Sequence, residues 1–190
     1  MAKESFENQD FKDQNYSIER IQVGTYENCL FNSCIFNSAD LSDSTFMDCK
    51  FEHCDLSMAN LNGTAFKEVR FAHCKLLGLH FEECNPFLLK MHFHSCIMNY
   101  ASFVKVKLKH TKFIDCKMEE VDFTQSDLSS AIFKDCELAH AIFENTILDK
   151  ADLRSANNIS LDPEQNQIYQ AIFSSQNALG LLNKYQIIIE

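Results

Sequence analysis

Residues 31–61 read FNSCIFNSADLSDSTFMDCKFEHCDLSMANL, and a large apolar residue stands at every fifth position of this stretch. A smaller residue stands two positions before each large one, as Cys34 does before Phe36 and Ala39 before Leu41. A period of five matches neither the 3.6-residue period of an α-helix nor the two-residue alternation of a strand. The stretch therefore indicates an internal repeat in which every unit of five residues turns the same two positions inward.

The five-residue period extends from this stretch in both directions. Its N-terminal run of large residues is Phe6, Phe11, Tyr16, Ile21, Tyr26, Phe31, Phe36, Leu41, Phe46, Phe51, Leu56, Leu61, Phe66, Phe71, Leu76 and Phe81. A second run is Leu88, Phe93, Met98, Phe103, Leu108, Phe113, Met118, Phe123, Leu128, Phe133, Leu138, Phe143, Leu148 and Leu153. The longer gap between Phe81 and Leu88 places an insertion of two residues around Asn85-Pro86-Phe87.

The small residues keep the same period, and all nine cysteines of the chain belong to them. The cysteines are Cys29, Cys34, Cys49, Cys54, Cys74, Cys84, Cys96, Cys116 and Cys136. Pairs such as Cys29 and Cys34 could ligate a metal, but their C-x4-C spacing differs from the C-x2-C of zinc knuckles. Because a free cysteine packs as a small hydrophobe, we interpret all nine as structural thiols rather than metal ligands or redox groups.

This pattern resembles the pentapeptide-repeat family, whose repeat is loosely A(D/N)LXX with the large residue at its centre. Good copies are Ala39-Asp40-Leu41-Ser42-Asp43, Ala59-Asn60-Leu61-Asn62-Gly63 and Ala151-Asp152-Leu153-Arg154-Ser155. The resemblance implies an all-β fold, a right-handed quadrilateral β-helix in which four pentapeptides form one coil of twenty residues. The large and small residues would face inward and the other three positions outward. About seven coils would stack at the strand spacing of ~4.8 Å.

Columns of like residues follow from a coil of this length. Adding twenty residues, or twenty-two across the insertion, aligns six cysteines from Cys34 to Cys136 and six phenylalanines from Phe31 to Phe133. We therefore expect the insertion to bulge outward without changing the phase of the coils, with Phe87 packed beneath it. Since the chain has only four glycines and two prolines, we also expect corners made of ordinary right-handed turns.

The two ends of the chain depart from the repeat. Residues 1–20 keep the apolar period but carry Glu and Gln at the small positions, so we expect an N-terminal arm or cap there. The β-helix proper is predicted over 21–157, with its small bulge at 85–87. Residues 158–190 are predicted to be a C-terminal capping or dimerisation segment. In it we expect a strand over 168–173, a helix beginning at Ser174 or Ser175, and a last strand over 187–189.

The C-terminal segment resembles the tail of quinolone-resistance (Qnr-type), mycobacterial fluoroquinolone-resistance and microcin-immunity pentapeptide proteins. The resemblance lies in Leu161-Asp162-Pro163-Glu164, Asn166 and Leu179-Gly180-Leu181-Leu182. It implies a homodimer joined through the C-terminal segment. The residues expected at that dimer interface are Ile168, Phe173, Leu179, Leu181, Leu182, Tyr185, Ile187 and Ile189.

The same resemblance implies a function. Members of that group bind the type II topoisomerases, DNA gyrase and topoisomerase IV, and their acidic rods are thought to imitate a DNA duplex. This binding protects the enzyme from quinolones or from a topoisomerase toxin. The large loops that project from Qnr-type coils help to engage the enzyme, and the two-residue bulge here is far smaller.

Charge is distributed unevenly along this chain, whose formal net charge is -10. Residues 1–55 hold eleven acids and four bases, residues 56–112 three acids and eight bases, and residues 113–164 twelve acids and four bases. The acidic third, next to the tail, supplies the expected topoisomerase-binding residues. They are Glu119, Glu120, Asp122, Asp127, Asp135, Glu137, Glu144, Asp149 and Asp152. Simple solubility also explains such a surface, because net charge alone does not identify a partner.

The basic middle contains one outward column formed by Lys50, Arg70, His92 and Lys112. It could contact an acidic patch or bind nucleic acid weakly. The other interpretation is a solvated face whose charges neighbour acids such as Asp48, Glu52 and Glu68, and we favour this second interpretation.

Other function classes have less support in the sequence. It carries no nucleophile elbow, P-loop or glycine-rich phosphate cradle, so we expect no enzyme and no cofactor or metal. Net negative charge argues against direct binding of nucleic acid, and no apolar run approaches the ~18 residues of a membrane span. The polar N-terminus is unlike a secretory signal, which predicts a cytoplasmic protein with reduced thiols. The alternative function is a non-catalytic scaffold or protein-interaction rod with an unknown partner.

Overall fold

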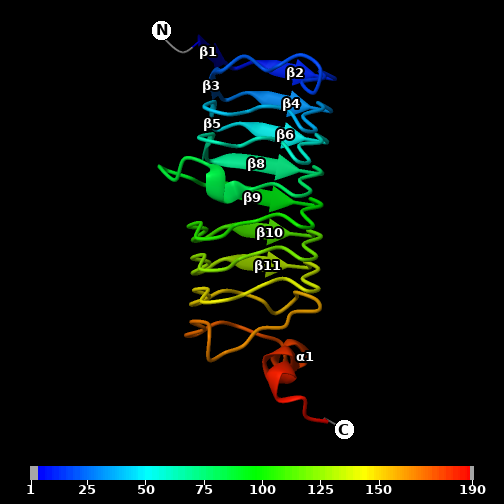
Figure 1. Ribbon diagram of the computed structural model, residues 1–190, viewed down its shortest axis with the longest axis vertical. Coiled ribbons are helices and arrows are strands. Elements are labelled where there is room, and N and C mark those ends of the chain that lie inside the picture. The colour runs from blue at the N-terminus through cyan, green and yellow to red at the C-terminus, as the bar shows by residue number, and fades with distance from the viewer. Residues whose placement is uncertain (1–3, 189–190) are drawn as a thin grey trace.

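The computed structural model describes residues 4–188 and shows a parallel β-solenoid (Figure 1). Its strands are β1 (Glu4–Glu7), β2 (Asp10–Lys12), β3 (Gly24–Glu27), β4 (Leu30–Asn32), β5 (Thr45–Met47), β6 (Lys50–Glu52), β7 (Ala65–Lys67), β8 (Val69–Ala72), β9 (Met91–His94), β10 (Lys112–Ile114) and β11 (Ile132–Lys134). The helical pieces are η1 (Phe81–Glu83), α1 (Ser175–Ala178) and η2 (Leu179–Tyr185). The predicted all-β solenoid with a short C-terminal helix is confirmed.

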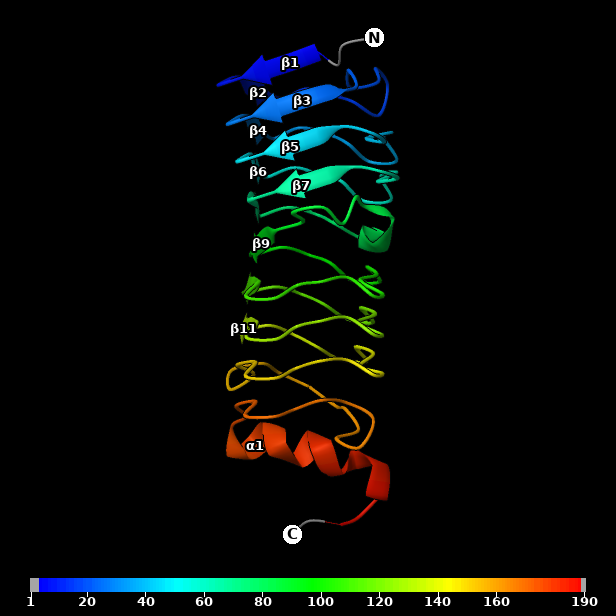
Figure 2. The ribbon, with the colours of Figure 1, turned by 90° about the vertical axis from the view of Figure 1, so that its left-hand side faces the viewer.

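Four ladders of parallel pairs run along the rod and define four faces. The first face holds the sheet β1-β3-β5-β7, seen in Figure 2, and continues as single bridges through residues 107, 127, 147 and 167. The second face holds the sheet β2-β4-β6-β8-β9-β10-β11 and ends at residues 152 and 172. The third face bridges residues 15, 35, 55, 75, 97, 117, 137 and 157. The fourth bridges residues 40 and 60, and then 80, 102, 122 and 142.

The register of these ladders confirms the coil length and the place of the insertion. Partners before the insertion differ by twenty residues, as Phe31 and Phe51 do. Phe71 pairs with Phe93, a step of twenty-two, and Phe113 with Phe133 returns to twenty. The second face therefore passes the insertion as an unbroken sheet. The third and fourth faces also stay paired across it, whereas the first face is interrupted there.

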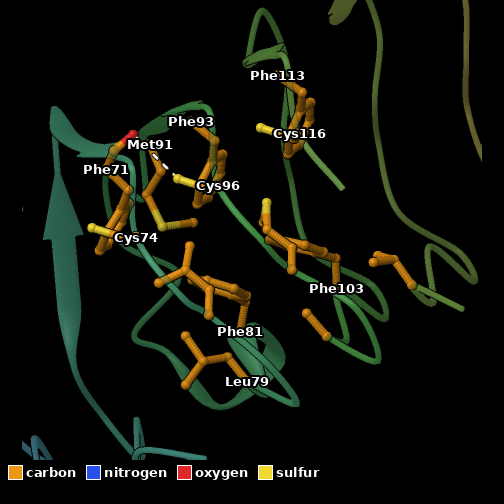
Figure 3. Packing of buried hydrophobic residues seen from close by; sticks show 14 of the residues in the cluster. Phe71, Cys74, Leu79, Phe81, Met91, Phe93, Cys96, Phe103, Phe113 and Cys116 are labelled. Atoms are coloured by element: carbon orange, nitrogen blue, oxygen red, sulfur yellow. Dashed lines mark hydrogen bonds between the residues drawn. The ribbon is translucent and has the colours of Figure 1, made fainter. Parts of the chain in front are cut away.

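The interior consists of stacked large residues. Along the second face each phenylalanine ring stacks on the ring one coil away, with centroids 4.7 Å apart for Phe31 and Phe51 and 5.2 Å for Phe93 and Phe113. Rings of opposite faces meet edge to face in the interior, as Phe93 of the second face and Phe103 of the fourth do at 6.1 Å, an arrangement that aromatic pairs favour. Figure 3 shows this packing where the insertion occurs.

The small inward positions are filled by side chains that also bond to the backbone. All nine cysteines are free and buried, at the inward positions predicted for them. The thiol of Cys74 lies 3.3 Å from the carbonyl oxygen of Phe51 in the preceding coil, and Cys96 donates in the same way to Phe71 (Figure 3). Burial raises the pKa of the Cys49 thiol to about 12, so this thiol stays protonated in the folded rod.

The corners differ from the prediction of right-handed turns. The residue two positions after each large one has a positive φ at nearly every described corner, for example 53° at Asp13, 55° at Ser33 and 62° at Lys105. Left-handed backbone costs an L-residue about 1–2 kcal/mol, least for Asn and Asp. The corner positions are rich in Asn, Asp, Ser and His, which replace the glycine that such a turn otherwise favours.

The described part of the N-terminal segment, residues 4–20, has the pairing of a coil. Strand β1 pairs in parallel with β3, and β2 with β4, so this segment covers the end of the solenoid rather than extending away from it. Its rings Phe6, Phe11 and Tyr16 pack against the core, whereas Glu4 and Gln9 at the small positions are exposed. The segment therefore forms the first coil of the solenoid, and the small positions of this coil carry exposed polar side chains.

Coil pairing also continues beyond the boundary predicted at residue 157. Gln167 bridges Ile147 and Ile172 bridges Asp152, so single bridges replace the strand expected over 168–173. The sequence pattern did not reveal this last C-terminal coil because a polar residue, Asn166, occupies one of its small inward positions. Its side chain donates to the carbonyl of Phe143 at 2.8 Å and accepts from the backbone N–H of Thr146 at 2.9 Å, replacing the missing apolar contact with hydrogen bonds.

Helix α1 and the following η2 close the C-terminal end of the solenoid (Figure 1). The helix begins as expected, because Ser174 accepts a hydrogen bond from the backbone N–H of Asn177. The buried Asn177 side chain donates to the carbonyls of Leu153 (2.8 Å) and Ala156 (2.5 Å), which a further coil would otherwise bind. Residues 187 and 188 form no strand, contrary to the prediction, and Ile189 lies outside the described residues.

Candidate functional site: the charged faces of the rod

Outward side chains of the solenoid lie in fixed columns, because every coil repeats the same backbone path. Whether two of the acidic residues predicted to bind a partner lie close together therefore depends on the face each occupies and not on their distance in the sequence. Four of them, Glu119, Glu120, Asp135 and Glu137, lie on the third face or at its corners, on two successive coils. Asp115, which the prediction omitted, occupies the corner one coil before Asp135. We call these five residues the acidic face.

Adding twenty residues to each candidate would have revealed Asp115, since Asp115 and Asp135 occupy the same column. Its carboxylate accepts a hydrogen bond of 2.7 Å from the hydroxyl of Ser95. Glu119 accepts from the Asn99 side chain at 3.2 Å, and Glu137 from that of Asn158 at 2.7 Å. These bonds extend along the rod and hold the carboxylates in place.

The other five predicted acids lie on different faces. Asp122 is on the fourth face, next to the corner of Glu120. Asp127 bridges residues of the first face and Asp152 of the second, and Glu144 and Asp149 lie near the corners on either side of the first face. The predicted set therefore surrounds the rod instead of forming one surface.

Two of these acids carry their own counter-ions. Asp127 is 3.2 Å from the ammonium of Lys109, and Asp152 is 2.8 Å from the guanidinium of Arg154. Burial opposes ionisation of Asp127, but hydrogen bonds from Ser129 outweigh it and lower the pKa of the carboxyl. The Arg154 side chain likewise lowers the pKa of Asp152. Both carboxylates are ionised and locally neutralised, so they are poorer candidates for a partner's cationic surface.

The residues predicted at the dimer interface fall into two groups. Ile168, Phe173 and Leu181 pack against the end of the core and act as a cap. Leu179 and Ile187 remain 44% and 55% exposed on the outer side of that cap. Leu182 is half-buried and Tyr185 is exposed.

Polar contacts fix the position of the cap. The Lys184 ammonium lies 2.7 Å from carboxylate oxygens of both Asp162 and Glu164. These two acids raise the pKa of Lys184, and the Tyr185 hydroxyl donates to Glu164 at 3.1 Å. The exposed apolar side chains of η2 are thereby presented at the end of the rod.

The insertion departs from the prediction that Phe87 packs beneath it. Phe87 is 68% exposed and Leu88 64% exposed, on a loop that projects from the rod beside η1 (Figure 1). The ammonium of Lys67 lies 5.5 Å from the Phe87 ring centroid. Inward positions at this level are already filled, since Cys84 and Met91 are buried, and this leaves no room for the added ring.

The histidines form no metal site among residues 4–188, although several lie close together. The His53 and His73 rings stack with centroids 4.9 Å apart, and His73 meets His94 edge to face at 5.5 Å. No group of three potential ligands converges within the described chain. In the same residues, no helix has the length and apolar character needed to cross a bilayer.

Together these features define a class, a parallel β-solenoid made of five-residue repeats with charged faces and capped ends. Comparison with models of known protein families identifies the family. The pentapeptide repeat region matches residues 64–143, and the model of pentapeptide repeats (8 copies) matches residues 27–63. The chain belongs to the pentapeptide-repeat family.

Solved structures of similar shape include QnrB1, a plasmid-mediated fluoroquinolone resistance protein. One trypsin-treated variant is 18% identical and covers 100% of both chains at a TM-score of 0.64. Another is 19% identical and covers 98% of this chain and 97% of QnrB1 at 0.62. HetL, involved in heterocyst differentiation regulation in the cyanobacterium Nostoc sp. strain PCC 7120, is 17% identical over 90% of this chain and 85% of its own, at 0.44. A search of curated proteins gave no match.

Proposed function

We propose that this protein binds a type II topoisomerase, DNA gyrase or topoisomerase IV, as a mimic of DNA and protects it from quinolones or from a topoisomerase toxin. The observation that carries the proposal is the acidic face, an array of carboxylates at fixed positions on a rigid rod. An enzyme surface that binds the phosphates of DNA would bind the same array through its arginines and lysines. Acting there, the protein would be cytoplasmic.

The charge density of the acidic face supports this proposal. Its five acids occupy two coils, which span ~10 Å at the strand spacing of ~4.8 Å. Lys117 on the same face reduces their net charge to about -4, or one negative charge per ~2.5 Å of rod. Duplex DNA carries one per ~1.7 Å, so the two densities are comparable. A face of the rod this acidic differs from a surface that is charged only for solubility, where both signs are interspersed.

The likeness in fold to QnrB1 over the full chain is consistent with the proposal, as is the capped C-terminal end. A second copy docked on the exposed residues of η2 would join two rods end to end. The acidic faces of the two copies would then lie on either side of the junction, where they would offer a longer acidic surface to the enzyme. The insertion loop with Phe87 is far smaller than the large loops of Qnr-type coils, so the proposal assigns it no role in binding.

Charge reversal on the acidic face tests the proposal. The test variant is Glu119→Lys/Glu120→Lys/Glu137→Lys, and the matched control is Glu7→Lys/Asp10→Lys/Glu27→Lys, which changes the net charge equally at the other end of the rod. We expect wild type and control to bind immobilised gyrase or topoisomerase IV and the test variant to lose at least tenfold in affinity. Equal affinity of all three proteins would contradict the proposal, and so would failure of the wild type to bind either enzyme.

The dimer is tested separately by light scattering. We expect wild type to have about twice the monomer mass of 21.9 kDa. Leu179→Asp/Ile187→Asp should give the monomer, whereas Ile142→Asp, at an exposed apolar residue of the fourth face, should not. A wild-type monomer, or a dimer in the double variant, would exclude the cap as the interface.

A further inference from the structure

A row of three cations and one histidine lies on the second face, opposite in sign to the acidic face. Lys50, Arg70, His92 and Lys112 occupy equivalent positions of β6, β8, β9 and β10, and each lies beside the next in the sheet. Figure 1 shows these four strands one below another. We call these four residues the basic row. They line a shallow depression of about 450 Å³, and its other lining residues are Glu52, Phe71, Ala72, Phe93, His94 and Ile114.

The cations of the basic row are not neutralised by the acids expected to surround them. Among residues 4–188, none of Lys50, Arg70 and Lys112 forms an ion pair. Glu68, which the sequence suggested as a neighbour, is instead engaged by the ammonium of Lys90. Only one carboxylate, that of Glu52, borders the depression.

His92 adds polarity to the row but no compensating charge. Its Nδ1 accepts a hydrogen bond of 3.2 Å from the backbone N–H of Lys112, which requires the neutral ring with its proton on Nε2. Burial and then the neighbouring Lys90 lower the pKa of His92, in agreement with that form. Like charges directly opposite each other on adjacent strands destabilise a sheet, so the pair Lys50 and Arg70 reduces the stability of the fold.

In the same column of the second face, each end of the basic row is followed by an apolar residue and then by an acidic one. Leu30 precedes Lys50 and Ile132 follows Lys112, and beyond them lie Asp10 and Asp152. The cations span three coil steps, or ~14 Å at ~4.8 Å per step. An extended peptide rises ~3.3 Å per residue, so four or five residues match this length.

We propose that the basic row is a docking surface for a short acidic segment of a partner protein, four or five residues long and rich in Glu or Asp. The segment lies along the column over β6, β8, β9 and β10, with its carboxylates on the two lysines and the arginine. Apolar residues next to the acidic stretch would contact Leu30 and Ile132. A longer acidic run would meet Asp10 or Asp152 and be repelled.

Nucleic acid fits this surface less well. Phe71 and Phe93 below the row are each only 1% exposed, so neither phenylalanine ring is available for a base to stack on. A polynucleotide longer than the row would also pass over the acidic thirds of a chain with net charge -10. The proposal does not depend on topoisomerase binding, because it concerns a different face of the rod.

The experiment measures binding of a fluorescent peptide, Ala-Glu-Glu-Glu-Glu-Glu-Ala, by anisotropy at low and at physiological salt. A five-nucleotide and a twenty-nucleotide oligothymidylate serve as nucleic-acid probes. The test variant is Lys50→Gln/Arg70→Gln/Lys112→Gln, and the control Lys105→Gln/Lys117→Gln/Lys150→Gln removes three other exposed lysines. We expect the wild type and the control to bind the peptide and the test variant to bind it at least tenfold more weakly.

Three results would overturn the proposal: no peptide binding by wild type at low salt, an equal loss of binding in both variants, or row-dependent binding of an oligonucleotide that is tighter than that of the peptide. Misfolding is separated from loss of the surface by thermal unfolding. Because the substitutions relieve repulsion between adjacent strands, the test variant should melt at or above the wild-type temperature.

Discussion

A buried hydroxyl in the small-residue column gives a sharp test of how the interior is stabilised. Ser126 is fully buried, and among the described residues its Oγ has no hydrogen-bond partner. Thr146 occupies the same column one coil later and is equally buried. Its Oγ1 donates to the carbonyl of Phe123 at 2.9 Å. The two side chains thus differ in whether the hydroxyl is satisfied.

Removing each hydroxyl should have opposite effects. A buried polar group without a partner costs about 1–3 kcal/mol, so Ser126→Ala should raise the free energy of unfolding by about 1 kcal/mol or more. Thr146→Val keeps the shape of the side chain but loses its hydrogen bond, which should lower that free energy by about 0.5–1.5 kcal/mol. For a chain of this size 1 kcal/mol shifts the melting temperature by about 2–4 °C.

Urea unfolding followed by circular dichroism, with thermal melts as a check, measures both changes. The two variants should move the unfolding midpoint in opposite directions, with the slope of the transition unchanged. A destabilised Ser126→Ala would refute the reasoning, because it would mean that the hydroxyl has a partner in the folded rod. An unchanged Thr146→Val would show that the hydrogen bond from Thr146 to Phe123 in the preceding coil contributes nothing.

Three further predictions concern the cap, the thiols and the corners. Gly180→Ala would push a Cβ into the backbone carbonyl of Ile159 and should therefore displace the cap. The free energy of unfolding in urea should fall by about 1–3 kcal/mol, and protease cleavage after residue 173 should increase. Unchanged cleavage would contradict the docking of the cap on the end of the solenoid. The thiols should resist iodoacetamide in the folded protein, because all nine are buried, and mass spectrometry should find them modified only after denaturation. Lys105→Asn should raise the melting temperature, since Asn tolerates the left-handed φ of 62° better than Lys by about 0.5–1 kcal/mol; a lower melting temperature would argue against strain at the corner.

Much of the fold could be predicted because the five-residue repeat is visible in any short stretch of the sequence and determines the path of the whole chain. One large and one small inward residue in every five determine the coil, and the steps of twenty or twenty-two residues follow from counting. The corners could not be predicted from glycine content, because Asn, Asp, Ser and His occupy the left-handed positions there. The last coil was missed because Asn166 replaces an apolar contact with side-chain hydrogen bonds to the backbone.

The charged faces were harder to predict than the core. Sequence order grouped Asp127 and Asp152 with the other acids, but the coil separates them onto different faces, where Lys109 and Arg154 pair with them. The basic row was visible as a column, whereas its lack of counter-ions depends on which neighbour Glu68 pairs with, and that requires the structure. Phe87 faces solvent because the interior at its level is already filled.

The measurement that tests the central claim most directly is a DNA gyrase cleavage and supercoiling assay with a quinolone present. Purified wild-type protein should restore supercoiling and reduce the drug-stabilised cleavage complex at micromolar concentration or below. The variant Glu119→Lys/Glu120→Lys/Glu137→Lys should do neither, and the control reversed at Glu7, Asp10 and Glu27 should retain both effects. The contrary result is a wild-type protein that changes neither the catalytic activity nor the drug-stabilised cleavage complex of gyrase or of topoisomerase IV. In that case the acidic face does not act as a DNA mimic on these enzymes.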